Sequence, residues 1–199
     1  MAIINIKSKE RKPAALLFFM FFSIVSATIT GASVRDAVFL TQFDKSYLPV
    51  MFITIAVVMA GVIALYKKLT AGQDQIFVIS ISGALFSVSL FLLQSNLSGL
   101  FIPVLYIWME VVTILSIFQF WILAGEVFNA RQAKRIFTLM GAGGSFAGMG
   151  AGYGIKPFVS TFGSENLLFL TIFFIGLSVV MAQMLRPFRM PHKHKKVNS

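Results

Sequence analysis

The chain has 199 residues, of which 57% are hydrophobic and only 12% charged, and its formal net charge is +10. So few polar residues cannot cover the surface of a soluble domain of this size, which excludes a soluble globular protein. The chain has no cysteine, which excludes a disulfide framework and a thiolate metal site.

Six apolar stretches follow one another, each close to the length of about 20 residues that a helix needs to cross a bilayer. We expect helices over residues 14–34, 49–66, 76–93, 101–124, 136–155 and 167–185. The first stretch follows basic residues, as in a signal peptide. It is too long for one and no small-residue cleavage pattern follows, so we interpret it as an uncleaved helix. The sequence therefore predicts an all-α membrane protein with a basic N-terminus (1–13), a six-helix transmembrane domain (14–185) and a basic tail (186–199).

The basic residues gather beside alternate apolar stretches. All of the 17 Lys and Arg residues except Arg35, Lys45 and Lys156 lie in the N-terminal segment, after the second and fourth stretches, or in the tail. By the positive-inside rule, both termini lie in the cytoplasm. The lipid bilayer thus explains most of the net charge, and we expect no nucleic-acid partner. We expect an integral protein of the bacterial inner membrane.

Arg35 and Asp36 follow the first predicted helix, and apolar residues 37–40 come directly after them. If the helix ends at Val34, the charged pair is a cap at the outer surface. If the helix continues to Leu40, the stretch reaches about 27 residues, which is long enough to tilt and to place Arg35 inside the outer leaflet. Arg35 is then a candidate substrate-binding residue. The sequence leaves both alternatives open.

Glu110 lies within the fourth apolar stretch, where insertion of a charge costs roughly 2.5–3.5 kcal/mol. On a helix it shares a face with Thr113, Ile117 and Trp121. The carboxylate either reaches water near the outer interface or faces the bundle, where it binds substrate, a proton or a cationic side chain. Arg35 has the opposite charge on another predicted helix, so the two are a candidate ion pair. An arginine fork also suits a phosphate group.

The fifth stretch is rich in glycine. Gly144, Gly148 and Gly152 repeat every four residues, which gives one smooth face for close helix packing or sliding. A phosphate-binding loop is the alternative, but no Gly-Lys-Ser/Thr and no Gly-x-Gly-x-x-Gly follows a strand here. We therefore interpret the glycine face as a packing surface.

Enzyme chemistry is not expected. The sequence has no paired carboxylates, nucleophile–base pair or metal cluster, and its two histidines, His192 and His194, lie in the tail without a third ligand. We expect no cofactor and no metal.

Residues 120–137 read FWILAGEVFNARQAKRIF and are followed by the glycine run. This segment resembles the ATP/ADP translocase family, the nucleotide exchangers of plastids and obligate intracellular bacteria. The family has Phe-Trp, a small residue and Ala-Lys-Arg at the corresponding places, so Glu126, Lys134 and Arg135 fall in its cytoplasmic loop motif. Residues 34–38 (VRDAV), 47–49 (YLP) and 66–69 (YKKL) are similar to the family at the first two helices.

The resemblance implies a major-facilitator-like fold and exchange of nucleotides by alternating access. It also implies that the basic residue of helix 1 and the Glu of helix 4 contact substrate, which here are Arg35 and Glu110. We add their neighbours Asp36 and Trp121 as candidate substrate-binding residues. Arg35 stands where the family usually has Lys, and Gly125 where it tends to have Asn.

The family has about twelve spans in two halves, and this chain corresponds to the first half. The implied partner is a second six-helix half or a second copy, with a nucleotide as substrate. Two further functions fit the same helices: a carrier of another solute, or a membrane partner or anchor that transports nothing.

Overall fold

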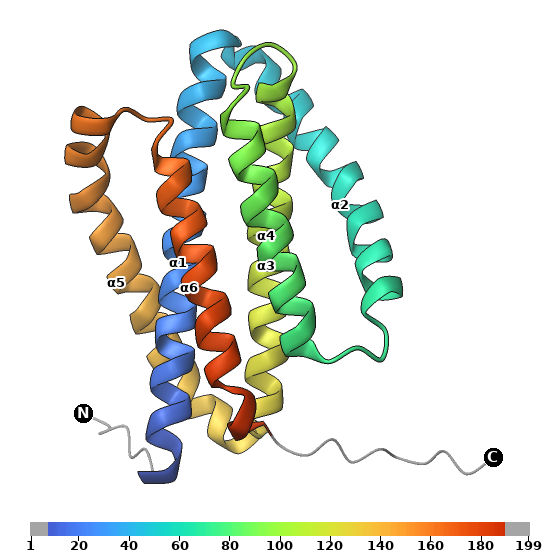
Figure 1. Ribbon diagram of the computed structural model, residues 1–199, viewed down its shortest axis with the longest axis vertical. Helices are drawn as coiled ribbons and strands as arrows, with labels where there is room; N and C mark the ends of the chain where they lie inside the picture. The colour runs from blue at the N-terminus through green and yellow to red at the C-terminus, as the bar shows by residue number, and fades with distance from the viewer. Residues whose placement is uncertain (1–7, 190–199) are drawn as a thin grey trace.

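The computed structural model describes residues 8–189, without the side chains of residues 8, 9, 130, 131 and 133–135. Within 8–189 the chain is helical and contains no strand (Figure 1). The long helices are α1 (Ser8–Gln42), α2 (Leu48–Thr70), α3 (Gln75–Gln94), α4 (Phe101–Val127), α5 (Ala130–Phe162) and α6 (Leu167–Met184). Two short 3-10 helices, η1 (Lys45–Tyr47) and η2 (Arg186–Phe188), precede α2 and follow α6.

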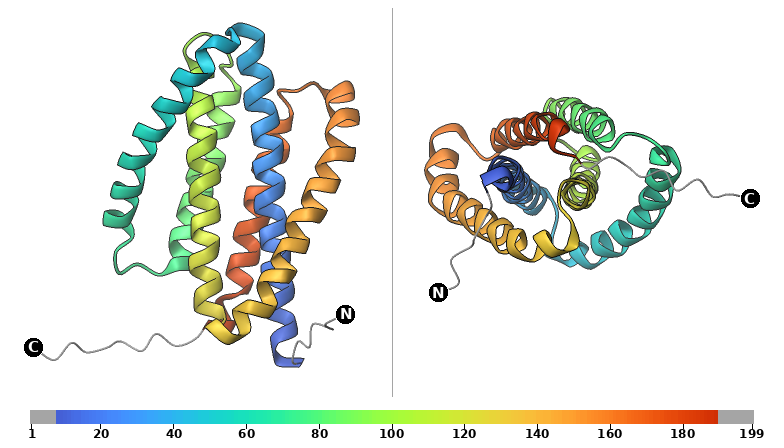
Figure 2. Two further views of the ribbon diagram at one scale, coloured as in Figure 1. Left: turned by 180° about the vertical axis from the view of Figure 1, so that it is seen from behind. Right: turned by 90° about the horizontal axis from the view of Figure 1, so that it is seen from below.

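The helices form a bundle with a centre and two flanks. Seen along the bundle, α1 and α4 occupy the middle, α3 and α6 cover one side, and α2 and α5 lie at opposite flanks (Figure 2). The most extensive packing is between α1 and α6, followed by that of α1 on α5 and on α4. The helix α2 packs mainly on α4. Hence α1 is the central element of the fold, and the two flanking helices keep much of their surface exposed.

Polar side chains cap the N-termini of two of the helices. The carboxylate of Asp74 accepts hydrogen bonds from the backbone N–H groups of Ile76 and Phe77 at the start of α3. Asn129 and Gln132 form a reciprocal capping box at the start of α5. Such caps satisfy backbone donors that a helix leaves unpaired, and they fix where each helix begins.

The core has a close contact where α1, α4 and α6 meet. A Cβ built on Gly31 would lie 2.0 Å from the terminal methyl of Met109 and 3.3 Å from the Thr171 side chain, so any larger residue would require Met109 to move. One residue earlier, the hydroxyl of Thr30 hydrogen-bonds that of Thr171 at 2.9 Å. The small residues that precede Arg35 on α1 therefore allow the backbones to approach closely.

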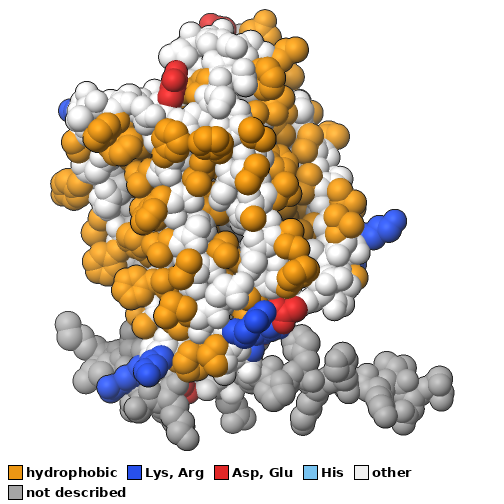
Figure 3. Space-filling view, viewed as in Figure 1, with side chains coloured by type: hydrophobic (Ala, Val, Ile, Leu, Met, Phe, Trp, Pro, Cys, Tyr) orange, Lys and Arg blue, Asp and Glu red, His pale blue; other side chains and the backbone are white. Residues whose placement is uncertain are grey.

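Five helices are long and apolar enough to cross a membrane, within residues 8–189: α1, α2, α3, α4 and α6. Large hydrophobic side chains such as Ile53, Val57 and Leu69 are exposed on α2. On one face, hydrophobic side chains cover the middle and most charged ones lie toward the ends (Figure 3). Because exposed apolar side chains are stable in lipid and not in water, this architecture is that of an integral membrane protein.

The helix α5 is not among the five apolar spans, although it has 33 residues. At about 1.5 Å per residue it is long enough to cross a bilayer. Its glycines, serines and Lys156 lower its hydropathy. The expected sixth span is thus present as a helix of sufficient length, but composition alone does not make it a membrane span.

The predicted boundaries of the first helix, Ala14 and Val34, are wrong. The helix begins at Ser8, includes Pro13 and continues without interruption to Gln42. Of the two alternatives for Arg35, the structure therefore contains the continuous helix. It can continue because the Arg35 charge has partners inside the bundle, as described below.

Both described ends of the chain lie at one end of the bundle, together with the α2–α3 and α4–α5 connections (Figure 1). The other end holds η1 and the connections α3–α4 and α5–α6. The connections that the sequence marks as basic are therefore at the same end of the molecule.

Candidate functional site

Arg35 is the centre of a charged group between α1 and α4. Its Nε donates to Asp36 Oδ1 at 2.9 Å, and its Nη1 donates to Glu110 Oε1 in a short ion pair. The ion pair expected between Arg35 and Glu110 is therefore present. It links two helices through residues 75 positions apart in the chain. We call Arg35, Asp36 and Glu110 the charged triad.

Aromatic side chains hold the guanidinium in place. Arg35 lies over the Tyr106 ring, with 4.5 Å between the guanidinium carbon and the ring centroid. Tyr106 in turn contacts Phe39 at a centroid distance of 4.8 Å, and both rings are buried. A cation over an aromatic face is stabilised by the ring quadrupole. Tyr106 precedes Glu110 by one helical turn, a spacing that could have identified it as a third contact of Arg35.

Access to the triad is uneven. The Arg35 side chain is 12% exposed, whereas those of Glu110 and Asp36 are 26% and 48% exposed. A solute would thus meet the two carboxylates before the guanidinium. With all three groups ionised the triad carries a net charge of −1, which opposes the approach of an anion to Arg35 while both carboxylates stay in place.

The triad lies within the apolar length of the bundle and not at its tip. Arg35 is seven residues before the end of α1, and Glu110 is nine residues after the start of α4. At about 1.5 Å per residue these offsets are roughly 10 and 14 Å. Charged side chains inside otherwise apolar helices are unusual in membrane proteins and mark candidate functional groups.

Trp121 is not part of this group. It shares a helix face with Glu110 but lies eleven residues, or about 16 Å, further along α4. Its ring contacts those of Phe21, Phe120 and Phe137 at centroid distances of 5.9, 5.1 and 5.2 Å. It thus packs where α1, α4 and α5 meet, and the structure brings together three of the four residues expected to bind substrate.

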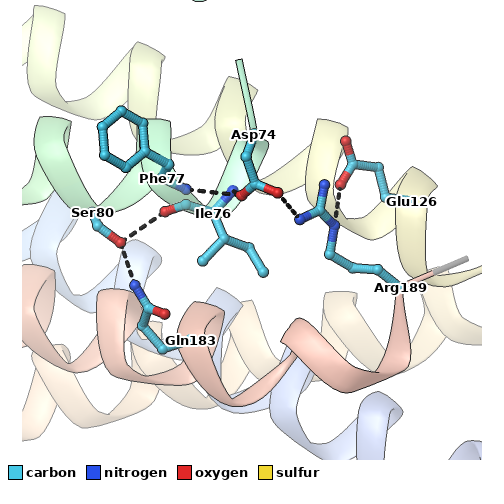
Figure 4. Close-up of polar contacts among 7 residues, drawn as sticks. All are labelled: Asp74, Ile76, Phe77, Ser80, Glu126, Gln183 and Arg189. Carbon is cyan, nitrogen blue, oxygen red and sulfur yellow. Dashed lines mark hydrogen bonds and ion pairs between the residues drawn. The ribbon is translucent and has the colours of Figure 1, made fainter. Parts of the chain in front are cut away.

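A second charged group lies at the opposite end of α4 (Figure 4). Arg189, just after η2, forms an ion pair through its Nε with Glu126 Oε2 at 2.8 Å, and its Nη1 donates to Asp74 Oδ2 in a short ion pair. Nearby, Gln183 Nε2 donates to the Ser80 hydroxyl at 2.6 Å and so links α6 to α3. These contacts join the ends of α3, α4 and α6, and we call Arg189, Asp74 and Glu126 the terminal cluster.

The terminal cluster shifts two pKa values. The hydrogen bond from Arg189 is the largest influence on the Asp74 carboxyl and holds its pKa below the ordinary value. Burial acts to lower the pKa of Arg189, but the hydrogen bond to Asp74 and the charges of Asp74 and Glu126 outweigh it, so that pKa is raised. Both ionised forms are thus stabilised by the contact.

Of the three residues in the predicted cytoplasmic loop motif, only Glu126 has a side chain that the structure describes. Glu126 is an ion-pair partner within the terminal cluster, with a side chain only 12% exposed. Lys134 and Arg135 lie in the first turns of α5, but their side chains are outside the described part of the structure. The adjacent Gln132 donates to Glu10 of α1 at 2.7 Å, which ties the start of α5 to the start of α1.

The three glycines of the predicted packing face lie in different surroundings. A Cβ on Gly144 would lie 3.3 Å from the Phe21 ring, so this glycine faces α1 directly. Gly148 and Gly152 have no neighbour within 4 Å of such a Cβ and line an open cavity of about 660 Å³ between α1 and α5. Lys156 and Ser160 line the same cavity.

No group of three or more His, Asp or Glu side chains that could hold a metal ion occurs within residues 8–189. His192 and His194 lie outside the described residues. The terminal cluster was not recognised from the sequence, where Arg189 counted only as one of the basic residues of the tail. The available signal was Asp74, an acid directly before an apolar stretch.

No protein-family model, curated protein or solved structure matches this chain. The ATP/ADP translocase resemblance of residues 120–137 and 34–38 thus stays a prediction.

Proposed function

We propose that this chain is one half of a membrane carrier and that the charged triad contacts the transported solute. The observation that carries the proposal is an arginine held between two carboxylates within the apolar length of the bundle. Buried charges in membrane helices are costly, so they are retained mainly where they bind substrate, ions or protons. The carrier has six spans, including α5, and both termini are cytoplasmic, in the inner membrane of a bacterium.

The surface of α5 supports the need for a partner. Ser145, Gly148, Gly152, Lys156 and Ser160 are exposed along this helix. Lipid tails do not satisfy a lysine or hydroxyl, whereas a neighbouring protein helix can approach glycine closely. A second six-helix half, or a second copy of the chain, would cover this face. Rocking of the two halves would then expose the triad to each side in turn.

The proposed substrate is a nucleotide, exchanged in an ATP/ADP antiport. The support is the resemblance of the triad and the loop motif to the nucleotide exchangers, together with the fit of an arginine fork to phosphate. In this mechanism a phosphate oxygen replaces Glu110 as the acceptor of the Arg35 N–H groups. Glu110 returns to Arg35 when the site empties, so Arg35 is never left unpaired.

The net charge of the triad favours a second candidate, a carrier of the same fold for a solute with a cationic group. Such a solute would contact Asp36 and Glu110, the more exposed members, without displacing Arg35. The third reading, a membrane anchor without transport, requires the triad to serve packing alone.

Counter-exchange in proteoliposomes distinguishes these functions. The full chain is reconstituted with whatever protein co-purifies from its membrane, the vesicles are loaded with ATP, and uptake of labelled ADP is measured. We expect the parent chain to take up ADP. Arg35→Ala should reduce this uptake at least 100-fold. Arg35→Lys should reduce it less, since lysine keeps the positive charge but loses the planar guanidinium that bonds two oxygens at once. Lys45→Ala, on the exposed η1, is the matched control and should transport normally.

Each outcome of this experiment favours a different one of the three functions. Absence of nucleotide uptake removes the nucleotide claim, and a panel of labelled cationic and anionic metabolites in the same vesicles then tests for another solute. If no solute moves, and if Arg35→Ala leaves the function of the co-purifying protein unchanged, the anchor is favoured.

A further inference from the structure

Two small cavities lie inside the bundle where α1, α4 and α6 meet, and the proposed transport does not require them. The first is lined by these three helices, and the second also by α3. These are the helices in the middle and on one side of the bundle (Figure 2). Each cavity has a volume of about 10 Å³. Such a volume holds one water molecule when polar groups line it.

Polar side chains from all four helices line the two cavities. Ser116 of α4 and Ser178 of α6 line both of them, so the cavities are neighbours. A buried water makes about two to four hydrogen bonds, and each cavity offers four polar side chains. Besides the two shared serines, these are Thr28 and Thr113 in the first cavity and Ser82 and Gln119 in the second.

The amide of Gln119 needs a partner that the described chain does not provide. The residue is 3% exposed, and its Nε2 has no hydrogen-bond partner within residues 8–189. Its Oε1 lies 3.0 Å from the Ser82 hydroxyl oxygen, which also lies 3.1 Å from the backbone oxygen of Ile79. A hydroxyl has one proton and cannot donate to both.

If the Gln119 amide is turned over, its Nε2 donates to Ser82, and its Oε1 is left unpaired instead. In the first orientation the missing partner is a hydrogen-bond acceptor, and in the second it is a donor. A water molecule satisfies both orientations, whereas a metal cation satisfies only the second. The surroundings of this amide therefore favour water as the occupant of the cavity.

The cavities connect to the charged triad along α4. Glu110, Thr113, Ser116 and Gln119 follow one another at intervals of three residues, and we call these four side chains the polar track. Each interval advances about 4.5 Å along the helix and turns by about 60° around it. The track thus passes from the side of α4 where Glu110 meets α1 to the side where Gln119 meets α3.

The far end of the polar track lies close to the terminal cluster. The Gln75 side chain, which is 7% exposed, donates from Nε2 to the backbone oxygen of Gln119 at 3.4 Å. Gln75 directly follows Asp74, which pairs with Arg189 (Figure 4). Buried polar groups therefore extend from the triad to the other charged group of the bundle. Polar side chains inside membrane bundles mark the pathways of solutes, ions or protons.

We propose that the two cavities hold water and that a proton reaches Glu110 through them from the end of the bundle with the terminal cluster. Each water or hydroxyl on the way accepts one proton and releases another. The last water gives its proton to a carboxylate oxygen of Glu110, where an O–H bond forms, and the water is left neutral. The net charge of the triad then changes from −1 to 0, and Arg35 keeps Asp36 as its only ionised partner.

Glu110 is well placed to be the proton acceptor. The titratable side chains around it are Arg35 and Asp36 from α1 and Tyr106 from α4. The helices α3 and α6 contain no charged residue, and the lysines of α2 lie in its last turn, at the opposite end of the bundle. Coupling of this proton to an anionic solute rests on the proposed carrier function, whereas the water and the proton do not.

The hydration of the cavities can be measured without any solute. Ser178 and Thr171 are both buried and lie on the same face of α6, seven residues apart. Ser178 lines both cavities, whereas Thr171 lines neither and its hydroxyl is bonded to Thr30. Because the chain has no cysteine, Ser178→Cys and Thr171→Cys each introduce a single thiol.

The full chain in membrane vesicles is exposed to Ag⁺, which is small enough to follow a file of water. The thiols that stay free are then counted with a maleimide after denaturation. We expect Ser178→Cys to react about tenfold faster than Thr171→Cys, because only the first thiol meets water.

Proton movement is measured as a transient current on a solid-supported membrane, again without solute. Vesicles that expose the terminal cluster to the bath receive a step to lower pH. We expect a charge displacement in the parent that Glu110→Gln abolishes. Gln119→Leu, which has a similar volume but no amide, should slow the current about tenfold, as loss of one hydrogen bond does to a barrier. Thr171→Val removes a hydroxyl outside the cavities and should leave the current unchanged.

Equal reaction of the two thiols would mean that the cavities are dry, and it would overturn the proposal. So would the absence of a current in the parent, a current that survives Glu110→Gln, or one that Gln119→Leu leaves unchanged. Circular dichroism and the melting temperature of each variant verify that it is folded. If ADP exchange fails while these results hold, only the proposed solute is removed.

Discussion

The guanidinium of Arg35 on α1 donates to Glu110 on α4 and to its own neighbour Asp36, so that two carboxylates share one cation. The packing around it is tight, since Tyr106 lies against the guanidinium and Gly31 allows α4 and α6 to approach α1. Removal of Arg35 therefore leaves two carboxylates without their cation, whereas removal of Glu110 leaves Arg35 paired with Asp36 alone. The ion pairs of the triad can therefore be tested by measuring the stability of variants as well as their transport activity.

We expect Arg35→Leu and Glu110→Gln each to lower the free energy of unfolding. The decrease should be about 2–3 kcal/mol for Arg35→Leu, because two carboxylates then lose their partner. The double variant should be more stable than the sum predicts, with a coupling energy of about 1–2 kcal/mol. Denaturant unfolding in detergent micelles, followed by circular dichroism, measures both.

The control pairs Arg35→Leu with Glu165→Gln, an exposed acid near the start of α6. These two changes should add, because the side chains do not interact. Additivity of the Arg35 and Glu110 substitutions would mean that the ion pair contributes nothing to stability.

The Arg35–Glu110 pair could be predicted from the sequence because each charge lies in an otherwise apolar stretch. A charge in lipid needs an opposite charge, and few candidates exist. The depth of the pair could not be predicted, since it depends on whether α1 stops at Val34. The energetic reason for the helix to continue to Gln42 lies in a contact with α4, which no local pattern of α1 reveals.

The stability contributed by Asp74 should depend on pH. The hydrogen bond from Arg189 lowers the folded-state pKa of the Asp74 carboxyl below its ordinary value of 3.8. A lowered carboxyl pKa stabilises the fold above the unfolded-state pKa, and this contribution is lost as the pH falls through the folded-state pKa. Asp74→Asn keeps a helix-capping acceptor and removes the charge.

The variant should therefore be less stable than the parent at pH 7, by at most about 1 kcal/mol because Asp74 is partly exposed and screened by solvent. The difference should shrink below about pH 4 and also at high salt. Melting temperatures from pH 2.5 to 7 at two salt concentrations provide the measurement. A difference that is the same at every pH would exclude the ion pair as its source.

Other parts of the site depend on contacts that are distant in the chain. Arg189 meets Asp74 across 115 positions, and the sequence alone gave it no partner. Trp121 shares a face with Glu110, yet helical periodicity fixes direction and not distance, and eleven residues separate the two along α4. The glycine repeat of α5 likewise predicts a smooth helix face, but it does not predict at which residue α5 diverges from α1.

Because α5 diverges from α1, two glycines of α5 should respond differently to substitution by alanine. At Gly148 a Cβ would meet nothing within 4 Å, so Gly148→Ala should stabilise the isolated chain by up to about 1 kcal/mol through helix propensity. At Gly143 a Cβ would lie 3.2 Å from the backbone carbonyl oxygen of Phe18, so Gly143→Ala should lose that gain or destabilise. Unfolding of the monomer in detergent compares them.

A larger substitution at Gly148 tests whether a partner covers α5. If one does, Gly148→Leu should weaken assembly, measured by native mass spectrometry, while the monomer stays as stable as the parent. Unchanged assembly would mean that Gly148 faces lipid or water, and the proposed carrier would then need another interface.

The sixth span can be tested directly because the chain has no cysteine, so each introduced cysteine is unique. Ser98 lies between α3 and α4, Ser164 between α5 and α6, and Gln73 between α2 and α3. If α5 crosses the membrane, Ser98→Cys and Ser164→Cys react with an impermeant maleimide on right-side-out vesicles, and Gln73→Cys reacts only after permeabilisation. Ser164→Cys behaving like Gln73→Cys would show that α5 stays on the cytoplasmic side. A glycine-rich helix with Lys156 exposed crosses lipid stably only when protein covers that face, so a positive result also favours a partner.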